Sequence, residues 1–265
     1  TGMFTNCKPG LSVRLRDEEV CIGEVMKENG YRTAYIGKWH LDEPEINHSQ
    51  EPLSGARDWD AYTPPGIRRH GFDYWYAYNT CDTHLTPHYW TDSPNPIRVE
   101  QWSPEHETDV AIRYLQDAAQ KEQPFALFVS WNPPHSPYHF VPEKYRQLYK
   151  DLKFPVRDNV DAERLHYHTP EASKMTEEDL RQATRDYFAA VSGLDEQFGR
   201  LLDSLKELGL DENTIVVLTA DHGDMMGSHG LMAKHVWYEE SIGIPMVVGG
   251  AGRRVRGAGR GAWED

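Results

Sequence analysis

Short apolar runs that end in ionisable residues are the feature that most restricts the fold of this chain. The run Thr214–Thr219 is β-branched and bounded by polar residues, as in a buried strand of a parallel sheet. Asp221 and His222 follow it directly, at the start of the stretch DHGDMMGSHGLMAKH. Open α/β sheets bind ligands outside the carboxyl ends of their strands. The pattern therefore predicts an anion site beside a metal at the end of this strand.

Two further segments have the same organisation. Gly30–Leu41 contains a short strand, a glycine, and then Lys38 and His40, which alternate onto one face of an extended chain. Phe125–Trp131 is another apolar run, and the sequence Asn-Pro-Pro-His-Ser-Pro that ends at Pro137 follows it. Each of these predicted strands ends in a cationic or metal-binding residue.

Predicted helices alternate with the strands, which indicates an α/β fold. Acidic residues and a terminal glycine predict a helix over Asp17–Asn29. Ser103 and Pro104 start a second helix that extends to about Gln120, and its inner face is predicted to carry Val110, Ala111, Tyr114, Leu115 and Ala118. A capping box at Thr176 starts a long helix that ends at Gly209. The segment 42–103 is rich in proline, aromatic residues and histidine, and we expect a substrate-facing insertion there.

Composition limits the possible partners. The 265 residues fit one main α/β domain. The formal net charge of −14 argues against a nucleic-acid partner, because that binding requires lysine and arginine to neutralise phosphates. No long apolar segment predicts a membrane span. The three cysteines have no metal-type spacing and do not indicate a disulfide framework. An anionic substrate would need a local cluster of cations.

Three motifs together resemble the sulfatase family of the alkaline phosphatase superfamily. They are G-Y-x-T-x-x-x-G-K-W-H-L at Gly30–Leu41, P-P-H-x-P at Pro133–Pro137, and D-H-G-D-M-x-G-x-H-G-L-x-x-K-H at Asp221–His235. Their order and spacing extend the resemblance over nearly the whole chain. It implies an alkaline phosphatase-like three-layer sandwich with a mostly parallel central sheet.

The chain departs from the family pattern at the nucleophile. Sulfatases of this type carry a C-x-P-S-R motif, or a similar one, whose cysteine or serine becomes formylglycine. Cys7 begins a segment that lacks the arginine and lies too close to Gly30 for the usual spacing. By resemblance, residues 1–265 are a partial N-terminal catalytic domain without the N-terminal strand, the nucleophile and the C-terminal subdomain. We expect this chain to be inactive by itself, and 249–265 to be a loop or tail toward that subdomain.

The resemblance assigns roles to several residues. Lys38 and Lys234 would hold the sulfate oxygens, and His135 would be the general acid that protonates the leaving alcohol. His40 would be the base that acts on the formylglycine hydrate. Asp221 and His222 would be ligands of a divalent cation, with Ca²⁺ expected and Mg²⁺ or Mn²⁺ as alternatives. Imidazole is a softer donor than Ca²⁺ prefers, so the identity of the metal stays open.

A second set of residues is predicted to contact substrate. It consists of His84, His88, Arg69 and His235. Histidines among aromatic residues suit sugar recognition, and a basic residue suits an anionic sugar. For His84 and His88, packing within the loop is an equally good explanation. For Arg69, the alternative is a solvated loop face. For His235 a supporting, hydrogen-bonded role is the alternative.

The predicted function is hydrolysis of sulfate monoesters, on sulfated carbohydrates or aryl sulfates. By resemblance, a formylglycine-generating enzyme matures the full-length protein, which is periplasmic or secreted. A phosphonate or phosphate monoester hydrolase of the same superfamily is one alternative. A catalytically dead anion- or glycan-binding fragment is the other.

Overall fold

The computed structural model describes residues 7–161, 165, 175–250 and 253–257. The chain forms two compact units. Unit 1 contains residues 1–142 and 193–204, and unit 2 contains 143–192 and 205–265. In the described residues, no helix is both long enough and apolar enough to cross a membrane.

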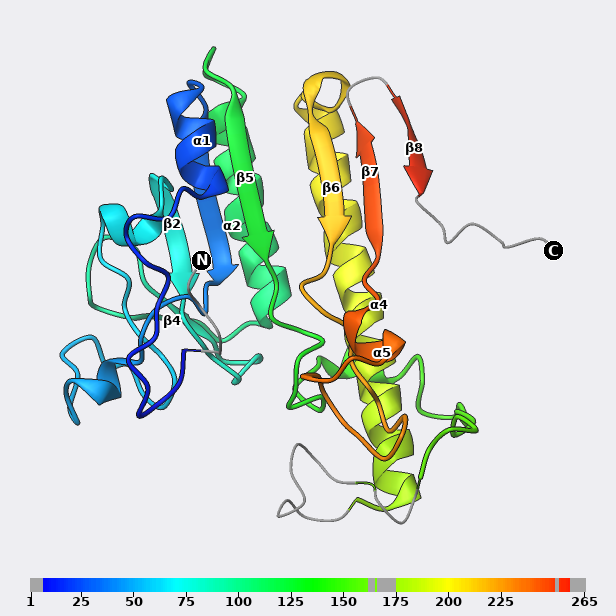
Figure 1. Ribbon diagram of the computed structural model, residues 1–265. Coiled ribbons are helices and arrows are strands. Elements are labelled where there is room, and N and C mark those ends of the chain that lie inside the picture. The colour runs from blue at the N-terminus through cyan, green and yellow to red at the C-terminus, as the bar shows by residue number, and fades with distance from the viewer. Residues whose placement is uncertain (1–6, 162–164, 166–174, 251–252, 258–265) are drawn as a thin grey trace. The chain divides into compact units, whose positions relative to one another are not determined.

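A parallel sheet organises unit 1 (Figure 1). Its central strand is β1 (Arg32–Lys38), which pairs in parallel with β2 (Tyr74–Tyr78) and with β5 (Phe125–Ser130). Lys38 lies opposite Tyr78, and Gly37 lies opposite Ser130. The predicted strands at Lys38 and at Phe125 are confirmed as parallel neighbours, and the expectation of an α/β fold with a parallel sheet is confirmed with them.

Helices and aromatic residues cover the two faces of this sheet. Helix α2 (Ser103–Ala118) packs on β1 and β5, and the predicted inner face of this helix is buried as Val110, Ala111, Tyr114, Leu115 and Ala118. The other face carries Tyr35 and Phe128, which pack with the buried Trp39, Phe72 and Trp75. Helix α1 (Ile22–Glu28) contacts β1 and lies on the side opposite α2 (Figure 1). It is shorter than the predicted helix from Asp17.

The expected insertion at 42–103 also supplies a core strand. Short 3-10 helices occupy Glu45–Asn47 (η1) and Ile67–Arg69 (η2), and a small hairpin joins β3 (His88–Tyr89) to β4 (Ile97–Arg98). Strand β2, however, belongs to the parallel sheet. Residues 74–78 were expected to be part of the irregular segment 42–103, so this strand was not predicted. Aromatic side chains are also enriched in strands, so the run YWYAY carried a strand signal.

Unit 2 combines a long helix with an antiparallel sheet. Its elements are α3 (Glu143–Arg146), α4 (Glu177–Glu207, of which 193–204 belong to unit 1), η3 (Asp211–Asn213), β6 (Ile215–Thr219), α5 (Glu239–Ile242), β7 (Met246–Gly250) and β8 (Arg253–Gly257). The predicted capping box is present, because Thr176 Oγ1 accepts a hydrogen bond from the Asp179 N–H at 3.1 Å. Gly209 follows the helix with a φ of +67°.

The prediction of a buried parallel strand at Thr214–Thr219 needs correction in this unit. Strand β6 exists, but its pairing with β7 is antiparallel, and the side chains of Ile215 and Val217 are exposed. A parallel return is usually made by a helix that crosses over the sheet. Between β6 and β7 the only helix in the described residues is the four-residue α5. An apolar run predicts a strand but does not specify the direction of its partner.

The segment 249–265 was expected to be a loop or tail. Gly249 and Gly250 instead end β7, and the backbone of β8 pairs antiparallel with β7. Residues 251–252 and 258–265 lie outside the described residues.

Gly37 permits a close approach that aligns β1 with β5. Its φ is +103°, and a Cβ atom there would lie 2.2 Å from the carbonyl oxygen of Ser130. Gly66 is a matched control, because its φ is +110° but nothing lies within 4 Å of its Cβ position.

We predict that Gly37→Ala destabilises the chain more than Gly66→Ala. The control loses about 1–3 kcal/mol from backbone strain alone. Gly37→Ala loses roughly 1–3 kcal/mol more, because Ser130 must move. Urea unfolding followed by tryptophan fluorescence measures both. Equal losses would show that the Ser130 contact does not restrict residue 37.

Candidate active site

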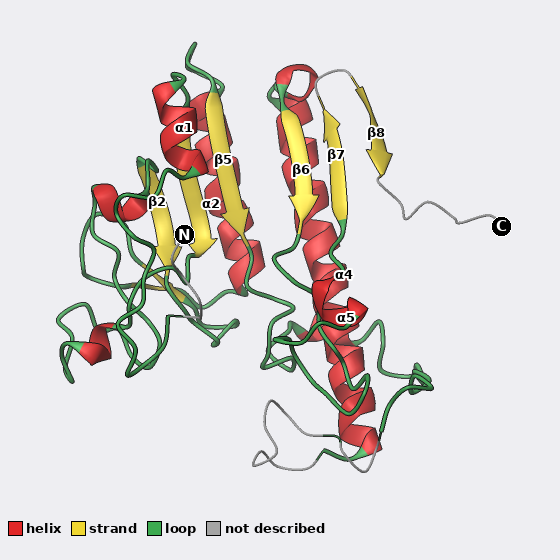
Figure 2. Cartoon of the chain, in the orientation of Figure 1, coloured by secondary structure: helices red, strands yellow, loops and turns green. Residues whose placement is uncertain are grey.

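The carboxyl ends of β1, β2 and β5 lie at one edge of the parallel sheet, because the three strands run in the same direction. Figure 2 shows that a loop follows each strand at this edge. The strand ends and the segments that follow them contain most of the polar residues that the sequence singled out in unit 1. They are Lys38 and His40 after β1, His84 and His88 after β2, and Asn132 and His135 after β5.

Hydrogen bonds connect Lys38 to the loop of His135. Lys38 Nζ donates to Asn132 Oδ1 at 2.8 Å, and Asn132 Nδ2 donates to the Cys81 carbonyl at 2.9 Å. Asn132 Nδ2 also lies 3.3 Å from Asp82 Oδ1, which is 3.7 Å from His135 Nδ1. Lys38 ends β1, Cys81 and Asp82 follow β2, and Asn132 and His135 follow β5. The structure therefore brings Lys38 and His135 together through Asn132 and Asp82.

The ring of His135 is held in one tautomer. Its Nδ1 donates to the Ser136 carbonyl at 2.7 Å, so the lone pair of the neutral ring is on Nε2. His84 supports the backbone of the same residue, because His84 Nε2 donates to the His135 carbonyl at 3.1 Å. Burial lowers the pKa of His84 to about 4, so this ring is neutral at pH 7. His84 is a positioning residue in this unit.

His40 is held in an unusual backbone conformation. Its φ is +49°, which is uncommon for a residue with a side chain. His40 Nε2 donates to the Cys7 carbonyl at 3.2 Å, and the ring packs edge to face with Trp59. The neutral ring therefore has its proton on Nε2 and its lone pair on Nδ1. Strain of this type occurs where surrounding contacts hold a functional side chain.

His88 is engaged on both sides of its ring. Nε2 donates to the buried Asp60 Oδ2 at 2.6 Å, and Nδ1 lies 3.7 Å from Cys81 Sγ. Desolvation alone would lower the pKa of His88, but the hydrogen bonds to Asp60 and Cys81 outweigh it and raise this pKa to about 9. Burial alone raises the pKa of Asp60, yet Oδ1 of this residue accepts three backbone N–H groups. We place the shared proton on His88 for this reason.

Cys81 completes this arrangement. Burial would raise the pKa of its thiol, but the contact with His88 outweighs burial and lowers the pKa below its ordinary value. Asp60, His88 and Cys81 thus form a buried network, in which His88 contacts both of the other side chains. It anchors the loop that carries Asp82 and His84.

Arg69 has a structural position. It is only 2% exposed, and its guanidinium binds Asp92 and the carbonyls of Thr63 and Thr91. The guanidinium carbon also lies 5.1 Å from the ring centroid of Trp75. These contacts hold the guanidinium inside the loop, so its position fits neither substrate binding nor the solvated loop face that was the alternative.

Unit 2 contains the second set of motif residues. Asp221 and His222 follow β6, and Asp221 Oδ2 lies 3.3 Å from His222 Nε2. His222 Nδ1 donates to the Gly223 carbonyl at 2.7 Å, so the neutral ring turns its Nε2 lone pair toward the Asp221 carboxylate. Two acceptors at this separation repel each other unless a proton or a cation lies between them. The donor pair therefore fits a divalent cation, and the Gly223 bond is typical of a metal-binding histidine.

Close packing explains why the third residue of the DHG motif is glycine. A Cβ atom on Gly223 would lie 2.1 Å from the Glu240 carbonyl oxygen, and the Gly223 N–H donates to Ser241 at 2.7 Å. Gly227 is similarly close to Leu180 of α4, at 2.6 Å from its Cβ position. These two contacts place the first part of the loop close to α5 and α4 of unit 2.

Lys234 and His235 lie in a strained loop. Positive φ angles occur at Met226, His229, Ala233 and His235, none of which is glycine. Asp224 Oδ1 accepts hydrogen bonds from the N–H groups of Met226 and Ala233 at 3.1 and 3.0 Å, which holds this backbone in place. Lys234 is half-buried and His235 is exposed. Such clustered strain is typical of a functional site.

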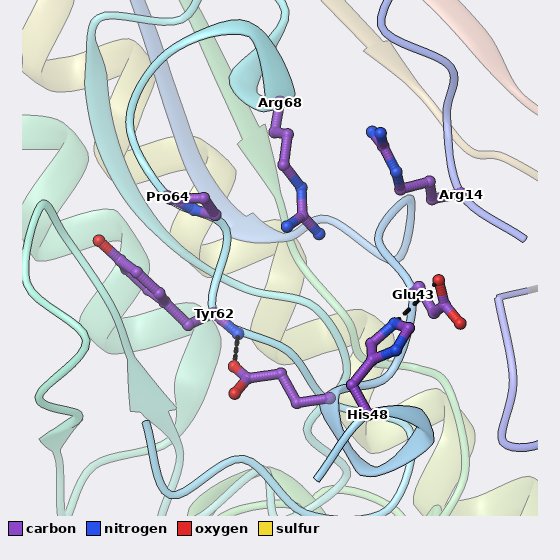
Figure 3. Close-up of a pocket in the computed structure, with 7 residues that line it drawn as sticks. Arg14, Glu43, His48, Tyr62, Pro64 and Arg68 are labelled. Atoms are coloured by element: carbon purple, nitrogen blue, oxygen red, sulfur yellow. Dashed lines mark hydrogen bonds and ion pairs between the residues drawn. The ribbon is translucent and has the colours of Figure 1, made fainter. Parts of the chain in front are cut away.

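A separate polar cavity of about 350 Å³ lies in unit 1 (Figure 3). Its lining residues are Arg14, Glu43, Glu45, His48, Tyr62, Pro64 and Arg68. Asp17 neutralises Arg14, and the buried Asp42 neutralises Arg68. With two glutamates also present, the cavity does not favour a sulfate group.

The fold is an α/β domain whose parallel sheet gathers Lys38, Asn132 and His135 at one edge. The chain belongs to the sulfatase family, whose pattern matches residues 1–258. The endo-4-O-sulfatase of Bacteroides thetaiotaomicron is 38% identical over 263 residues, covering 94% of this chain and 49% of that protein. The ulvan-active sulfatase of Formosa agariphila is 36% identical over 251 residues, covering 94% of this chain and 43% of that protein.

A solved structure supports the same family. It comes from work on the metabolism of glycosaminoglycans by Bacteroides thetaiotaomicron, and it superimposes with a TM-score of 0.77 at 38% identity. The match covers 92% of this chain and 50% of the solved chain. The chain spans about half the length of the curated relatives that it matches. The resemblance inferred from the three motifs is confirmed.

Sequence reasoning did not identify two of the carboxylates that organise unit 1. Asp82 connects Asn132 to His135, and Asp60 connects to His88. Asp82 is two residues before His84, and this position close to a histidine after a strand could have identified it from the sequence. Asp60 lies in irregular sequence and gave none.

We predict that the His88–Asp60 pair makes stability depend on pH in the alkaline range. The pKa of His88 is raised from about 6.5 in the unfolded chain to about 9 in the folded one. Its stabilising contribution is therefore complete below about pH 6.5 and is lost as pH rises through about 9. The free energy of unfolding of the unaltered chain should fall across this window more steeply than that of His88→Gln. Parallel pH profiles of the two chains would contradict the assignment.

Proposed function

We propose that this chain supplies catalytic residues of a sulfuric ester hydrolase that acts on sulfated carbohydrates. The observation that carries the proposal is the network from Lys38 through Asn132 and Asp82 to His135. It holds a fixed cation and a proton donor at one edge of the sheet. Sulfate ester cleavage needs both, because negative charge develops on the sulfate oxygens and on the leaving oxygen.

Lys38 holds the sulfate group. Its hydrogen bond to the Asn132 side chain fixes the ammonium without neutralising its charge, since an amide oxygen is uncharged. Lys234 has the same proposed role from unit 2. A fixed positive charge stabilises the transition state more than a mobile surface lysine can, because no reorganisation is needed during the reaction.

His135 protonates the leaving alcohol. The Nδ1 bond to the Ser136 carbonyl fixes the ring, so Nε2 is the atom that delivers a proton. Asp82 Oδ1 lies 3.7 Å from the same Nδ1 atom. His84 holds the main chain of His135 and thereby sets the position of the ring.

His40 is the base that would act on the formylglycine hydrate. Its Nε2 donates a hydrogen bond to the Cys7 carbonyl, so the Nδ1 lone pair accepts the proton.

Asp221 and His222 are the proposed ligands of the divalent cation. We propose Ca²⁺, and the same two donors can also bind Mg²⁺ or Mn²⁺. When present, formylglycine supplies the nucleophile and the cation polarises the sulfate ester. The formylglycine lies outside the motifs of this chain and requires a formylglycine-generating enzyme.

The carbohydrate part of the proposal rests on the relatives. Their names specify an endo-4-O-sulfatase and an ulvan-active sulfatase, which act on sulfated glycans. His235 remains a proposed substrate contact from unit 2, where its side chain is exposed. A periplasmic or secreted protein would meet such glycans directly.

We predict that Lys38→Ala lowers kcat for 4-nitrocatechol sulfate by about 10²–10³-fold, because one fixed charge on the sulfate is lost. The assay uses a polypeptide that carries this sequence together with a formylglycine-bearing segment, matured by its generating enzyme and supplied with Ca²⁺. Lys27→Ala is the matched control, since Lys27 pairs with Asp73 at the surface. Similar losses in both variants would contradict the role of Lys38.

The same assay tests the activity itself. Hydrolysis of the sulfate ester in preference to aryl phosphate and phosphonate esters supports the proposal. Preference for a phosphorus ester would make the protein a phosphonate or phosphate monoester hydrolase. Binding of sulfated oligosaccharides without turnover of any ester would make it a glycan-binding protein.

A second prediction isolates the general acid. His135→Asn should lower kcat by about 10²–10⁴-fold for a sulfated sugar, whose alkoxide needs a proton to leave. For 4-nitrocatechol sulfate the loss should be much smaller, because the phenolate is a good leaving group. Rates on the two substrates measure the difference. Equal losses would show that His135 does not protonate the leaving group.

A further inference from the structure

We propose that Cys21, Glu24 and His70 form a zinc-binding site in unit 1, apart from the residues proposed for sulfate hydrolysis. Cys21 directly precedes α1, Glu24 lies in its first turn, and His70 directly follows η2. One ligand atom from each of these side chains lies within 4.8 Å of the other two. Small side-chain rotations are enough to bring the three donors onto one ion.

The backbone is built to bring these residues together. A Cβ atom on Gly23 would lie 2.4 Å from the His70 carbonyl oxygen, and one on Gly71 would lie 2.3 Å from the Glu24 nitrogen. His70 itself has a left-handed conformation, with a φ of +42°. Two glycines and one strained residue thus allow the loop after η2 to press against the start of α1.

The buried ring of His70 points to a ligand. Its side chain is 1% exposed, and neither ring nitrogen makes a hydrogen bond within the described part of the chain. Nδ1 lies 3.3 Å from Glu24 Oε1, and the ring stacks on Trp39. A buried polar group without a hydrogen bond is costly, so such a group in a native protein calls for an explanation. A metal ion bound to one ring nitrogen provides it.

Glu24 is oriented for the same purpose. Its Oε2 accepts the Cys21 N–H at 2.6 Å, which leaves Oε1 directed toward His70. The capping bond therefore fixes the carboxylate before any metal binds. Second contacts of this kind orient metal-binding side chains in proteins.

The donor set selects a particular metal. A thiolate, an imidazole and a carboxylate are the ligands of Zn²⁺, and Ca²⁺ and Mg²⁺ take oxygen ligands instead. Cys21 is only half-buried, so a water molecule can reach the fourth position. Binding replaces the thiol proton by the metal and releases that proton to solvent. A simple ion pair between His70 and Glu24 is the competing explanation, and it does not involve Cys21.

The experiment is a Co²⁺ titration of this chain, followed by Zn²⁺ competition. A thiolate bound to Co²⁺ gives a charge-transfer band in the near ultraviolet, which an oxygen and nitrogen site does not give. Excess Ca²⁺ is present so that Co²⁺ does not accumulate at Asp221 and His222. The titration measures the thiolate band and not hydrolysis, so failure of the proposed hydrolase function does not affect the result. We expect one thiolate-bound Co²⁺ per chain, displaced by one Zn²⁺.

Two variants remove ligands without removing the local fold. Serine is a preferred residue before a helix, so Cys21→Ser keeps the cap of α1. Asparagine tolerates the left-handed conformation, so His70→Asn keeps the backbone. Each should abolish the band and weaken Zn²⁺ binding by more than about 10-fold, since loss of even an outer contact has an effect of this size. Cys81→Ser is the matched control and should keep the band, although Cys81 also lies beside a histidine.

A chemical measurement on the unaltered chain gives an independent result. Zn²⁺ should slow iodoacetamide alkylation of Cys21, measured by mass spectrometry of peptides, while the rate at Cys81 stays unchanged. The proposal is overturned if no thiolate band forms, if the band survives Cys21→Ser, or if Zn²⁺ does not protect Cys21. A band that Cys81→Ser removes would assign the metal to the Cys81–His88 pair instead.

Discussion

The parallel alignment of β1 between β2 and β5 is the constraint on which unit 1 depends. Because all three strands end at one edge, residues that are far apart in sequence meet there. Lys38 and Asn132 are 94 residues apart, yet they are joined by a 2.8 Å hydrogen bond. The alignment requires glycine at position 37, where the Ser130 carbonyl leaves no room for a Cβ atom. The motif G-K is therefore a glycine that packing requires, followed by the lysine for which we propose a catalytic role.

Burial lowers the number of unpaired negative charges in unit 1. The formal charge of −14 counts every carboxyl group as ionised. Glu107, however, is fully buried and hydrogen-bonded to Tyr89, and burial raises its pKa well above the ordinary value. Asp42 is buried against Arg68, and Asp60 against His88. Several negative charges are thus neutralised or paired inside unit 1, which reduces the repulsion that an anionic substrate would meet.

Local patterns predicted some elements well and others poorly. The inner face of α2 and the capping box of α4 follow from helical spacing and from one short motif, so both predictions are confirmed. Strand β2 was missed, since its aromatic run lies within a segment rich in proline and histidine that indicated irregular structure. The buried position of Arg69 was also missed. Its partners lie in the backbone of Thr63 and Thr91 and in the Asp92 side chain, and no sequence pattern encodes those contacts.

The sequence by itself determined the family, the apolar runs and the identity of the ionisable residues that follow them. These are properties of short segments, in which spacing and residue type are enough. Only the tertiary structure decided the direction of β6, the link from Lys38 to His135 through Asp82, and the meeting of Cys21 with His70. Each depends on contacts between distant segments, whose free energy comes from packing and buried hydrogen bonds rather than from local propensity.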